Sequence, residues 1–157
     1  MHVIVSDTLF CYPEVYVICG VIVMDSLKFF VPRAGKIHVD EVDNEHEEVV
    51  EALDLVCLHI DNAEFETVSK TREVGNLLLS HFKSEERLMK SFEYPHLNQH
   101  TVHHDQSLGS VYRILGNCEM HRRVDIEELR DLFRILIDDI FSADMAFSSY
   151  LMTQKKI

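Results

Sequence analysis

The sequence of 157 residues contains no tryptophan and little glycine or proline, with five and three copies respectively. Glycine and proline are the residues that most often form turns, so their scarcity leaves much of the chain free to form helix. None of the four cysteines belongs to a C-x-x-C pair, which excludes a zinc knuckle and a thioredoxin-type redox motif. Because no secretory signal is recognisable, we expect reduced thiols and a cytoplasmic location.

Positive charge is scarce as well. The 15 Lys and Arg residues face 27 Asp and Glu residues, for a formal net charge of −12. This balance argues against a nucleic-acid backbone or an anionic membrane surface as a partner. The apolar run at positions 15–24 (VYVICGVIVM) is too short to span a membrane as a helix, and its β-branched residues predict a strand or a buried arm. Alternatively, Met24 is the natural start and residues 1–23 are an upstream extension.

After this run the pattern becomes regular. From residue 42 onwards, apolar residues recur at the spacing of an amphipathic helix. We expect an amino-terminal arm over residues 1–25 and one helical domain over residues 26–157. The expected helices cover about 43–60, 64–92, 95–116 and the chain from 125 onwards. The fold class predicted from this pattern is all-α, an up-down-up-down four-helix bundle with an amino-terminal arm.

Two helix starts carry recognisable capping residues. Asp43 is a candidate N-cap for the first helix, because a side-chain carboxylate can accept hydrogen bonds from the first backbone N–H groups. Asp125 and Glu128 have the spacing of a capping box at the start of the fourth.

Ten histidines are the unusual feature of the composition. Four of them, together with one glutamate, occupy positions within the apolar stripes of the first three expected helices: His46, His81, Glu85, His100 and His104. His81 and Glu85 are four residues apart, as are His100 and His104, so each pair points the same way from successive turns. Five further histidines lie off the stripes or near helix ends and are interpreted as surface residues: His38, His59, His96, His103 and His121.

A single histidine on an apolar face is usually a hydrogen-bonded core residue. The five stripe residues together are harder to explain in that way, because the stripes of a bundle converge on one core and a buried carboxylate needs a partner. These faces carry no Lys or Arg to form an internal salt bridge. A metal cation would satisfy all five side chains. Zinc takes about four ligands, whereas imidazole and carboxylate without thiolate suit iron or manganese, and the number of ligands favours two ions.

The fourth expected helix adds two carboxylates, Asp139 and Asp144, on the flanks of its apolar stripe. On a regular α-helix, residues five apart point roughly 140° away from each other. Helical periodicity alone therefore does not bring these two side chains together.

Three segments resemble the hemerythrin family, and bacterial hemerythrins in particular. They are VDNEHEE at positions 42–48, HFKSEERLM at positions 81–89, and Tyr94-Pro95 followed by His100 and His104. The resemblance covers about residues 26–155. It implies a four-helix bundle around a non-haem di-iron centre that binds O2 reversibly.

The same resemblance implies roles for individual residues. His46 and His81 match the two histidine ligands of one iron, which keeps an open coordination position. His100 and His104 match two of the three histidine ligands of the other iron, while Glu85 and Asp144 match the bridging carboxylates.

One position departs from the family pattern. The family has a histidine five residues before the bridging aspartate, where this sequence has Asp139. As a ligand, a carboxylate should stabilise Fe(III) and favour irreversible oxidation; alternatively, Asp139 points away and water takes its place.

Three functional readings therefore remain open. The first is an O2 carrier or sensor with two Fe ions, Mn being a possible substitute. The second is a di-iron redox enzyme that reduces peroxide, nitric oxide or O2. The third is a bundle with one metal ion or none. No sequence feature indicates the oligomeric state.

Overall fold

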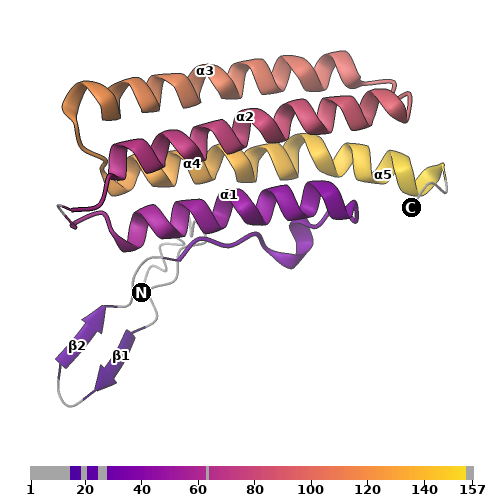
Figure 1. Ribbon diagram of the computed structural model, residues 1–157. Helices are drawn as coiled ribbons and strands as arrows, with labels where there is room; N and C mark the ends of the chain where they lie inside the picture. Colours follow the sequence, from indigo (N-terminus) through magenta and orange to yellow (C-terminus); the bar gives the residue numbers. More distant parts are fainter. Residues whose placement is uncertain (1–14, 19–20, 25–27, 63, 155–157) are drawn as a thin grey trace, which may run out of the picture.

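A computed structural model describes residues 15–18, 21–24, 28–62 and 64–154 (Figure 1). Its helices are α1 (Asp40–Leu58), α2 (Thr67–Ser91), α3 (Leu97–His121), α4 (Ile126–Asp139) and α5 (Met145–Thr153), with the short 3-10 helix η1 (Arg33–Gly35) before them and the π-helix η2 (Ile140–Asp144) between α4 and α5. Because η2 follows α4 directly and runs directly into α5, these three elements form one continuous rod, the fourth helix of the bundle.

The four helices form the expected up-down-up-down bundle (Figure 1). Each helix packs against the next one in the chain, and α4 packs back against α1 to close the ring. This arrangement confirms the predicted fold class. No helix in the described part of the chain is long and apolar enough to cross a membrane.

The amino-terminal apolar run forms two short strands, β1 (Val15–Ile18) and β2 (Val21–Met24). They pair antiparallel, with Val15 opposite Met24 and Ile18 opposite Val21. The expectation of a strand is therefore confirmed for these eight residues, and the rest of the arm predicted over residues 1–25 lies outside the described residues.

The predicted start of the first helix is wrong by one turn. Helix α1 begins at Asp40, and Asp43 is not its N-cap. The Asp43 carboxylate instead accepts hydrogen bonds from the backbone N–H groups of Ile37 (2.9 Å) and His38 (3.1 Å). It thereby fixes the segment that leads into the bundle, because these two donors lie outside any helix or strand.

The start of α4 agrees with the prediction from the sequence, whereas the end of α3 does not. The capping box of Asp125 and Glu128 is present at the start of α4 and confirms the prediction. Helix α3 continues to His121, past the end expected at residue 116, and closes with Arg122 in a left-handed conformation (φ 52°). Residue 116 is a glycine within the helix, so it does not end the helix as its usual preference suggested.

The core contains two separate clusters of buried apolar residues. The larger cluster fills most of the bundle and includes Leu53, Leu78 and Leu132, which are fully buried. The smaller one comprises Met89, Tyr94, Phe147 and Leu151. Along α2, α3 and the α4–α5 rod, the polar positions singled out in the sequence lie where the larger cluster ends, on the side toward the smaller one.

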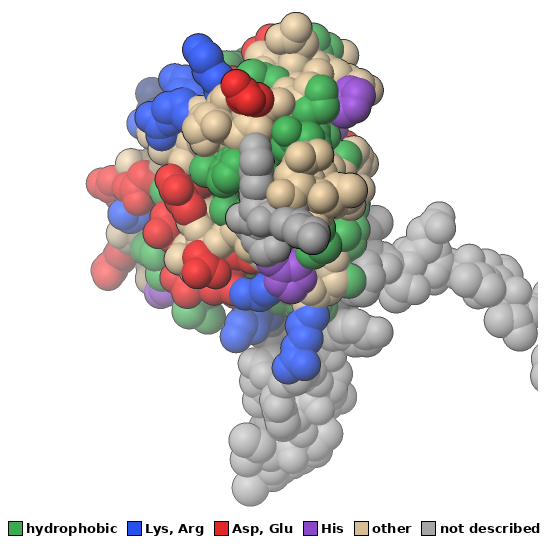
Figure 2. Space-filling view, turned by 90° about the vertical axis from the view of Figure 1, so that its right-hand side faces the viewer, with side chains coloured by type: hydrophobic (Ala, Val, Ile, Leu, Met, Phe, Trp, Pro, Cys, Tyr) green, Lys and Arg blue, Asp and Glu red, His purple; other side chains and the backbone are tan. Residues whose placement is uncertain are grey.

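The surface reflects the acidic composition. Figure 2 views the end of the bundle where α2 leads into α3 and shows acidic side chains gathered on one side of this face. Lys and Arg side chains lie in separate groups at its edges.

Candidate metal centre

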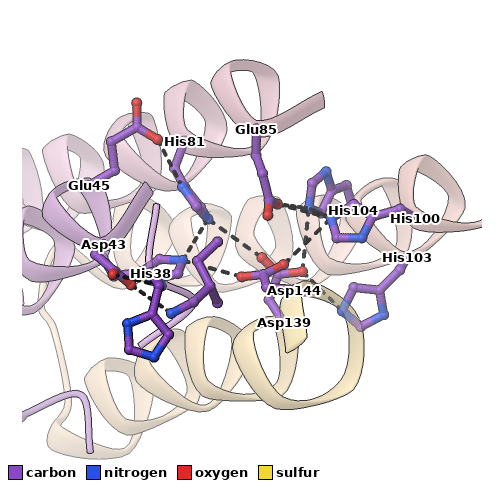
Figure 3. Close-up of polar contacts among 12 residues, drawn as sticks. His38, Asp43, Glu45, His81, Glu85, His100, His103, His104, Asp139 and Asp144 are labelled. Atoms are coloured by element: carbon purple, nitrogen blue, oxygen red, sulfur yellow. Dashed lines mark hydrogen bonds and ion pairs between the residues drawn. The ribbon is translucent and has the colours of Figure 1, made fainter. Parts of the chain in front are cut away.

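The structure brings the seven polar residues named from the sequence into one buried layer, which we call the polar layer (Figure 3). Its members are His46 of α1, His81 and Glu85 of α2, His100 and His104 of α3, Asp139 at the end of α4 and Asp144 at the end of η2. Their exposed fractions lie between 0% and 4%, as low as those of the leucines in the apolar core.

The π-helix brings Asp139 and Asp144 to the same side of the rod. Within η2 the helix is wider than an α-helix, and the backbone N–H of Met145 donates to the carbonyl of Ile140, five residues earlier. The expectation that the two carboxylates diverge by roughly 140° assumed a regular α-helix, and that assumption is wrong here. Single π-turns of this kind frequently occur at functional sites.

The imidazoles meet in two pairs at opposite ends of the polar layer. Nε2 of His46 lies 3.2 Å from Nε2 of His81, and Nε2 of His100 lies 2.9 Å from Nε2 of His104. Asp144 lies between the pairs, with its carboxylate oxygens 3.3 Å from Nε2 of His46 and 3.6 Å from Nε2 of His100. The four ring nitrogens and this carboxylate therefore converge on one space.

Two glutamates hold the outer nitrogens of these rings. Nδ1 of His81 lies 3.1 Å from Oε2 of Glu45, and Nδ1 of His104 lies 2.9 Å from Oε1 of Glu86. If each Nδ1–H donates to its carboxylate, the Nε2 lone pair is left facing the polar layer, which is the arrangement of metal-binding histidines in proteins. Neither glutamate was expected to contribute, although each directly precedes or follows a residue of the polar layer in the sequence.

Glu85 and Asp139 complete the layer. Oε2 of Glu85 lies 2.9 Å from Nε2 of His100 and 3.4 Å from Nε2 of His104. Asp139 reaches both ends, 3.6 Å from Nε2 of His81 and 3.3 Å from Nε2 of His104. Asp139 therefore points into the layer and not away from it, as the alternative expectation had it.

Many polar atoms of the layer lack a hydrogen bond. Among the described residues, buried atoms without a partner include Nδ1 of His46, Oε1 of Glu85 and both carboxylate oxygens of Asp139 and Asp144. Buried polar atoms are rarely left unpaired, because each unmade hydrogen bond costs about 1–3 kcal/mol. A cation in the middle of the layer would meet several of these atoms at once.

The spacing of the donor atoms fits a metal ion. Three overlapping groups have ligand atoms within 4.8 Å of one another: Glu85, His100, His104 and Asp144; His46, His81 and Asp144; and His81, Glu85, Asp139 and Asp144. Asp144 belongs to all three. No cysteine belongs to any of these groups in the described chain, and a donor set of imidazole and carboxylate suits iron or manganese.

The charges of the histidines show what a metal ion would replace. Burial disfavours the charged form of His81, but the nearby carboxylates of Asp139 and Glu45 outweigh burial and raise its pKa to about 9. Burial likewise opposes the charge on His104, yet its contacts with Asp139 and Glu85 raise the pKa to about 10. Without metal, both rings therefore carry an extra proton at neutral pH, and a cation would displace it.

The buried carboxylates also have shifted pKa values, and the shifts of Asp144 and Glu85 have opposite directions. Burial and then the negative charges of Glu85 and Asp139 raise the pKa of Asp144 well above its usual value, which favours the protonated form of this carboxyl. The pKa of Glu85 falls to about 2, because its bonds to the histidines of α3 outweigh the effect of burial. A cation bound among these carboxylates and imidazoles would compete with protons for the same atoms.

His103 was interpreted as a surface residue, and that interpretation is wrong. Its side chain is 24% exposed, but its Nε2 is buried and lies 3.3 Å from Oδ1 of Asp139. The spacing could have revealed it, because His103 follows His100 by three residues and so shares its face of α3. Of the other four, His38, His96 and His121 are exposed, and His59 is half-buried and stacked on Phe65.

Comparisons with protein-family models, with curated proteins and with solved structures found no match. The resemblance to hemerythrins therefore remains an inference from the motifs of the sequence, and the functional conclusion depends on the residues of the polar layer.

Proposed function

We propose that this chain is a hemerythrin-like protein that binds two iron ions in the polar layer and, through them, O2. The observation that carries the proposal is the convergence of two imidazole pairs on shared carboxylates, in a layer where both oxygens of Asp139 and Asp144 lack hydrogen bonds. Apolar packing alone gives no reason for this layer, because replacing it with leucines would preserve the bundle without the cost of burying charge.

The two imidazole pairs suggest how the ions would be shared. His46 and His81 would hold one ion, and His100 and His104 would hold the other. Asp144 lies within reach of both pairs, 3.3 Å from His46 and 3.6 Å from His100. Glu85 lies in two of the three candidate ligand groups. These two carboxylates are therefore the proposed bridges, with manganese as the substitute metal that the same donors would accept.

A pair of ferrous ions would supply the electrons and the open coordination position that O2 binding requires. The surrounding residues keep water out. The polar layer lies between two apolar clusters, and the ring of Phe82 stacks on that of His104 with centroids 4.1 Å apart. Excluding water strengthens the electrostatic interactions within the layer and limits proton exchange with solvent.

The visible spectrum of the full chain tests this proposal. The protein is loaded with ferrous iron under anaerobic conditions, and spectra are recorded before air is admitted, after it, and after O2 is removed again. An absorption that appears in air and disappears on deoxygenation is the expected result. Iron that binds without any spectral response to air would contradict O2 binding.

Asp139 favours a second candidate, a di-iron redox enzyme acting on peroxide, nitric oxide or O2. Its buried carboxylate lies within 3.6 Å of His81 and 3.3 Å of His104, so it would add a third negative charge beside the ions. Added negative charge stabilises Fe(III) relative to Fe(II) and would favour irreversible oxidation.

The variant Asp139→His distinguishes the two candidates. An imidazole at this position removes the extra charge, and we expect slower autoxidation of the reduced protein. The rate is followed by absorbance after air is admitted. An unchanged rate at unchanged iron content would show that Asp139 does not act on the iron.

A further inference from the structure

A surface cavity opens beside the polar layer, between the first turns of α3 and the α4–α5 rod. Its volume is about 260 Å3, and its walls include His100 and His103 of α3, Ser142 of η2 and Ala146 of α5. His100 belongs to the polar layer, so the cavity has a member of the layer in its wall.

This cavity is lined by the most exposed member of the polar layer. His100 is 4% exposed, whereas the other six members are 0% or 1% exposed. Two further cavities on the described surface do not reach the layer itself. One, along α3 and α4, has His103 and Asp138 in its wall, and another, between α2 and α3, reaches only Glu86.

His103 lies at the inner side of the cavity. It lines the cavity, and its buried Nε2 lies 3.3 Å from Oδ1 of Asp139 (Figure 3). Figure 3 shows its ring extending from α3 toward the carboxylates of the layer. Because its side chain is 24% exposed, the ring faces solvent on one side and the polar layer on the other. A rotation of this side chain would therefore open or close a path to the layer.

The lining indicates which ligands can enter. Among the described residues, no Asp or Glu lines this cavity, although the whole chain has a formal net charge of −12. The polar residues of its lining are three histidines, Tyr94, Gln99 and Ser142. A cavity of about 260 Å3 is smaller than the pockets that hold drug-sized ligands, which start at about 300 Å3. These properties suit a neutral or anionic molecule of a few atoms.

We propose that this cavity is the route by which a small neutral or anionic ligand reaches the polar layer, and that His103 is its gate. The inference depends on the proposed function, because it needs metal in the layer to bind the ligand. A gate affects the height of the barrier and not the bound state. A variant that narrows the route at Ala146, away from the polar layer, therefore changes the association and dissociation rates by the same factor and leaves the Kd unchanged.

Azide binding to the iron-loaded, oxidised full chain is the test, with the rates followed by stopped-flow absorbance. The variant Ala146→Phe places an aromatic ring in the mouth of the cavity, at an exposed position where folding tolerates it. The variant His103→Ala removes the gate. Ser110→Phe is the matched control, because it places the same ring on α3 in the wall of the neighbouring cavity.

We expect Ala146→Phe to slow association and dissociation severalfold and by equal factors, and His103→Ala to accelerate both. Ser110→Phe should behave as wild type. Unchanged rates in Ala146→Phe would overturn the route, and a changed Kd with an unchanged association rate in His103→Ala would overturn the gate.

The iron content of each protein is measured first, which separates this inference from the proposed function. If the iron-loaded wild type binds azide and Ala146→Phe binds it at the same rates, the route is refuted but the iron centre is not. Wild type that binds no iron refutes both.

Discussion

The same four helices build two layers of equal burial and opposite chemistry. In the larger apolar cluster, Leu53, Leu78 and Leu132 are fully buried. In the polar layer, His81, Glu85 and the two aspartates are buried just as completely. The difference is therefore not in how far the side chains are removed from water but in what they need once they are there.

The apolar layer needs only to be packed. Burying apolar surface contributes about 25 cal/mol per Å2, whatever the partner. The polar layer needs charge balance, and among the described residues the ion-pair partners of Glu85, Asp139 and Asp144 are all histidines. We therefore expect the contribution of the polar layer to stability to depend on bound protons or a bound cation, and the contribution of the apolar layer to be independent of both.

The largest expected effect is the response of the polar layer to metal. Saturating iron at about a thousand times its Kd would add about 4.1 kcal/mol to the stability of the folded state. For a chain of this length that corresponds to a rise of about 10 °C in Tm. Asp144→Asn should abolish the rise, because Asp144 belongs to every candidate ligand group.

Thermal unfolding followed by circular dichroism, with and without ferrous iron, measures this effect. Asp138→Asn is the control, since this neighbouring carboxylate is exposed and hydrogen-bonded to Ser142. If Asp144→Asn still gained stability from iron, the polar layer would not be the binding site.

A substitution in the apolar layer should lower stability without changing iron binding. Leu132→Ala, two turns before Asp139, should lower the free energy of unfolding by about 2–5 kcal/mol with and without iron alike. The folded variant should bind as much iron as wild type. Urea unfolding and elemental analysis measure the two quantities, and loss of iron from the folded variant would show that the layers are not independent.

A smaller effect is expected for a residue that holds a ring of the polar layer from outside. Glu86→Ala removes the carboxylate that accepts from Nδ1 of His104. Loss of such a partner typically weakens metal binding about 10–100-fold. Competition for iron against a chelator measures the affinity. Glu73→Ala is the matched control on α2, because Glu73 is exposed and pairs with Lys70. An equal loss of affinity in this variant would contradict a specific role for Glu86.

The smallest effect is expected at the far end of the rod, at the exposed side chain of Asp125. Asp125→Ala removes half of the capping box of α4 and should cost about 1 kcal/mol. The Tm should fall by about 2–4 °C, with the iron content unchanged. A larger fall accompanied by loss of iron would mean that the start of α4 is coupled to the polar layer.

The sequence was sufficient for the part of the site that follows helical periodicity. His46, His81, Glu85, His100 and His104 interrupt apolar stripes, and stripes meet in the core of a bundle, so their convergence could be predicted from spacing alone. The fold class followed from the same stripes and from the scarcity of turn residues.

The rest of the site depends on departures from regular geometry. Asp139 and Asp144 meet because η2 widens the helix, and no period of the sequence signals a single π-turn. Asp43 resembled an N-cap because it is an aspartate near a helix start, yet its carboxylate holds the preceding segment. Its role depends on where that segment lies in three dimensions, which local propensity does not determine.

Other residues were missed because they lie outside the apolar stripes of the helices. Glu45, Glu86 and His103 lie beside residues of the polar layer, in positions that a helix usually turns to solvent. Their partners are rings on other helices or, for His103, a carboxylate on α4. Such contacts depend on how the helices pack, and only His103, three residues after His100, has a spacing that could have revealed it.

The iron content of the full chain tests most directly whether the polar layer is a metal centre. The protein is reconstituted with excess ferrous iron under anaerobic conditions, freed of unbound metal, and analysed for iron per folded chain beside Asp144→Asn. Two irons per chain in wild type, and a loss of iron in the variant, are the expected result. A folded wild-type chain without iron, or with the same content as Asp144→Asn, would contradict it.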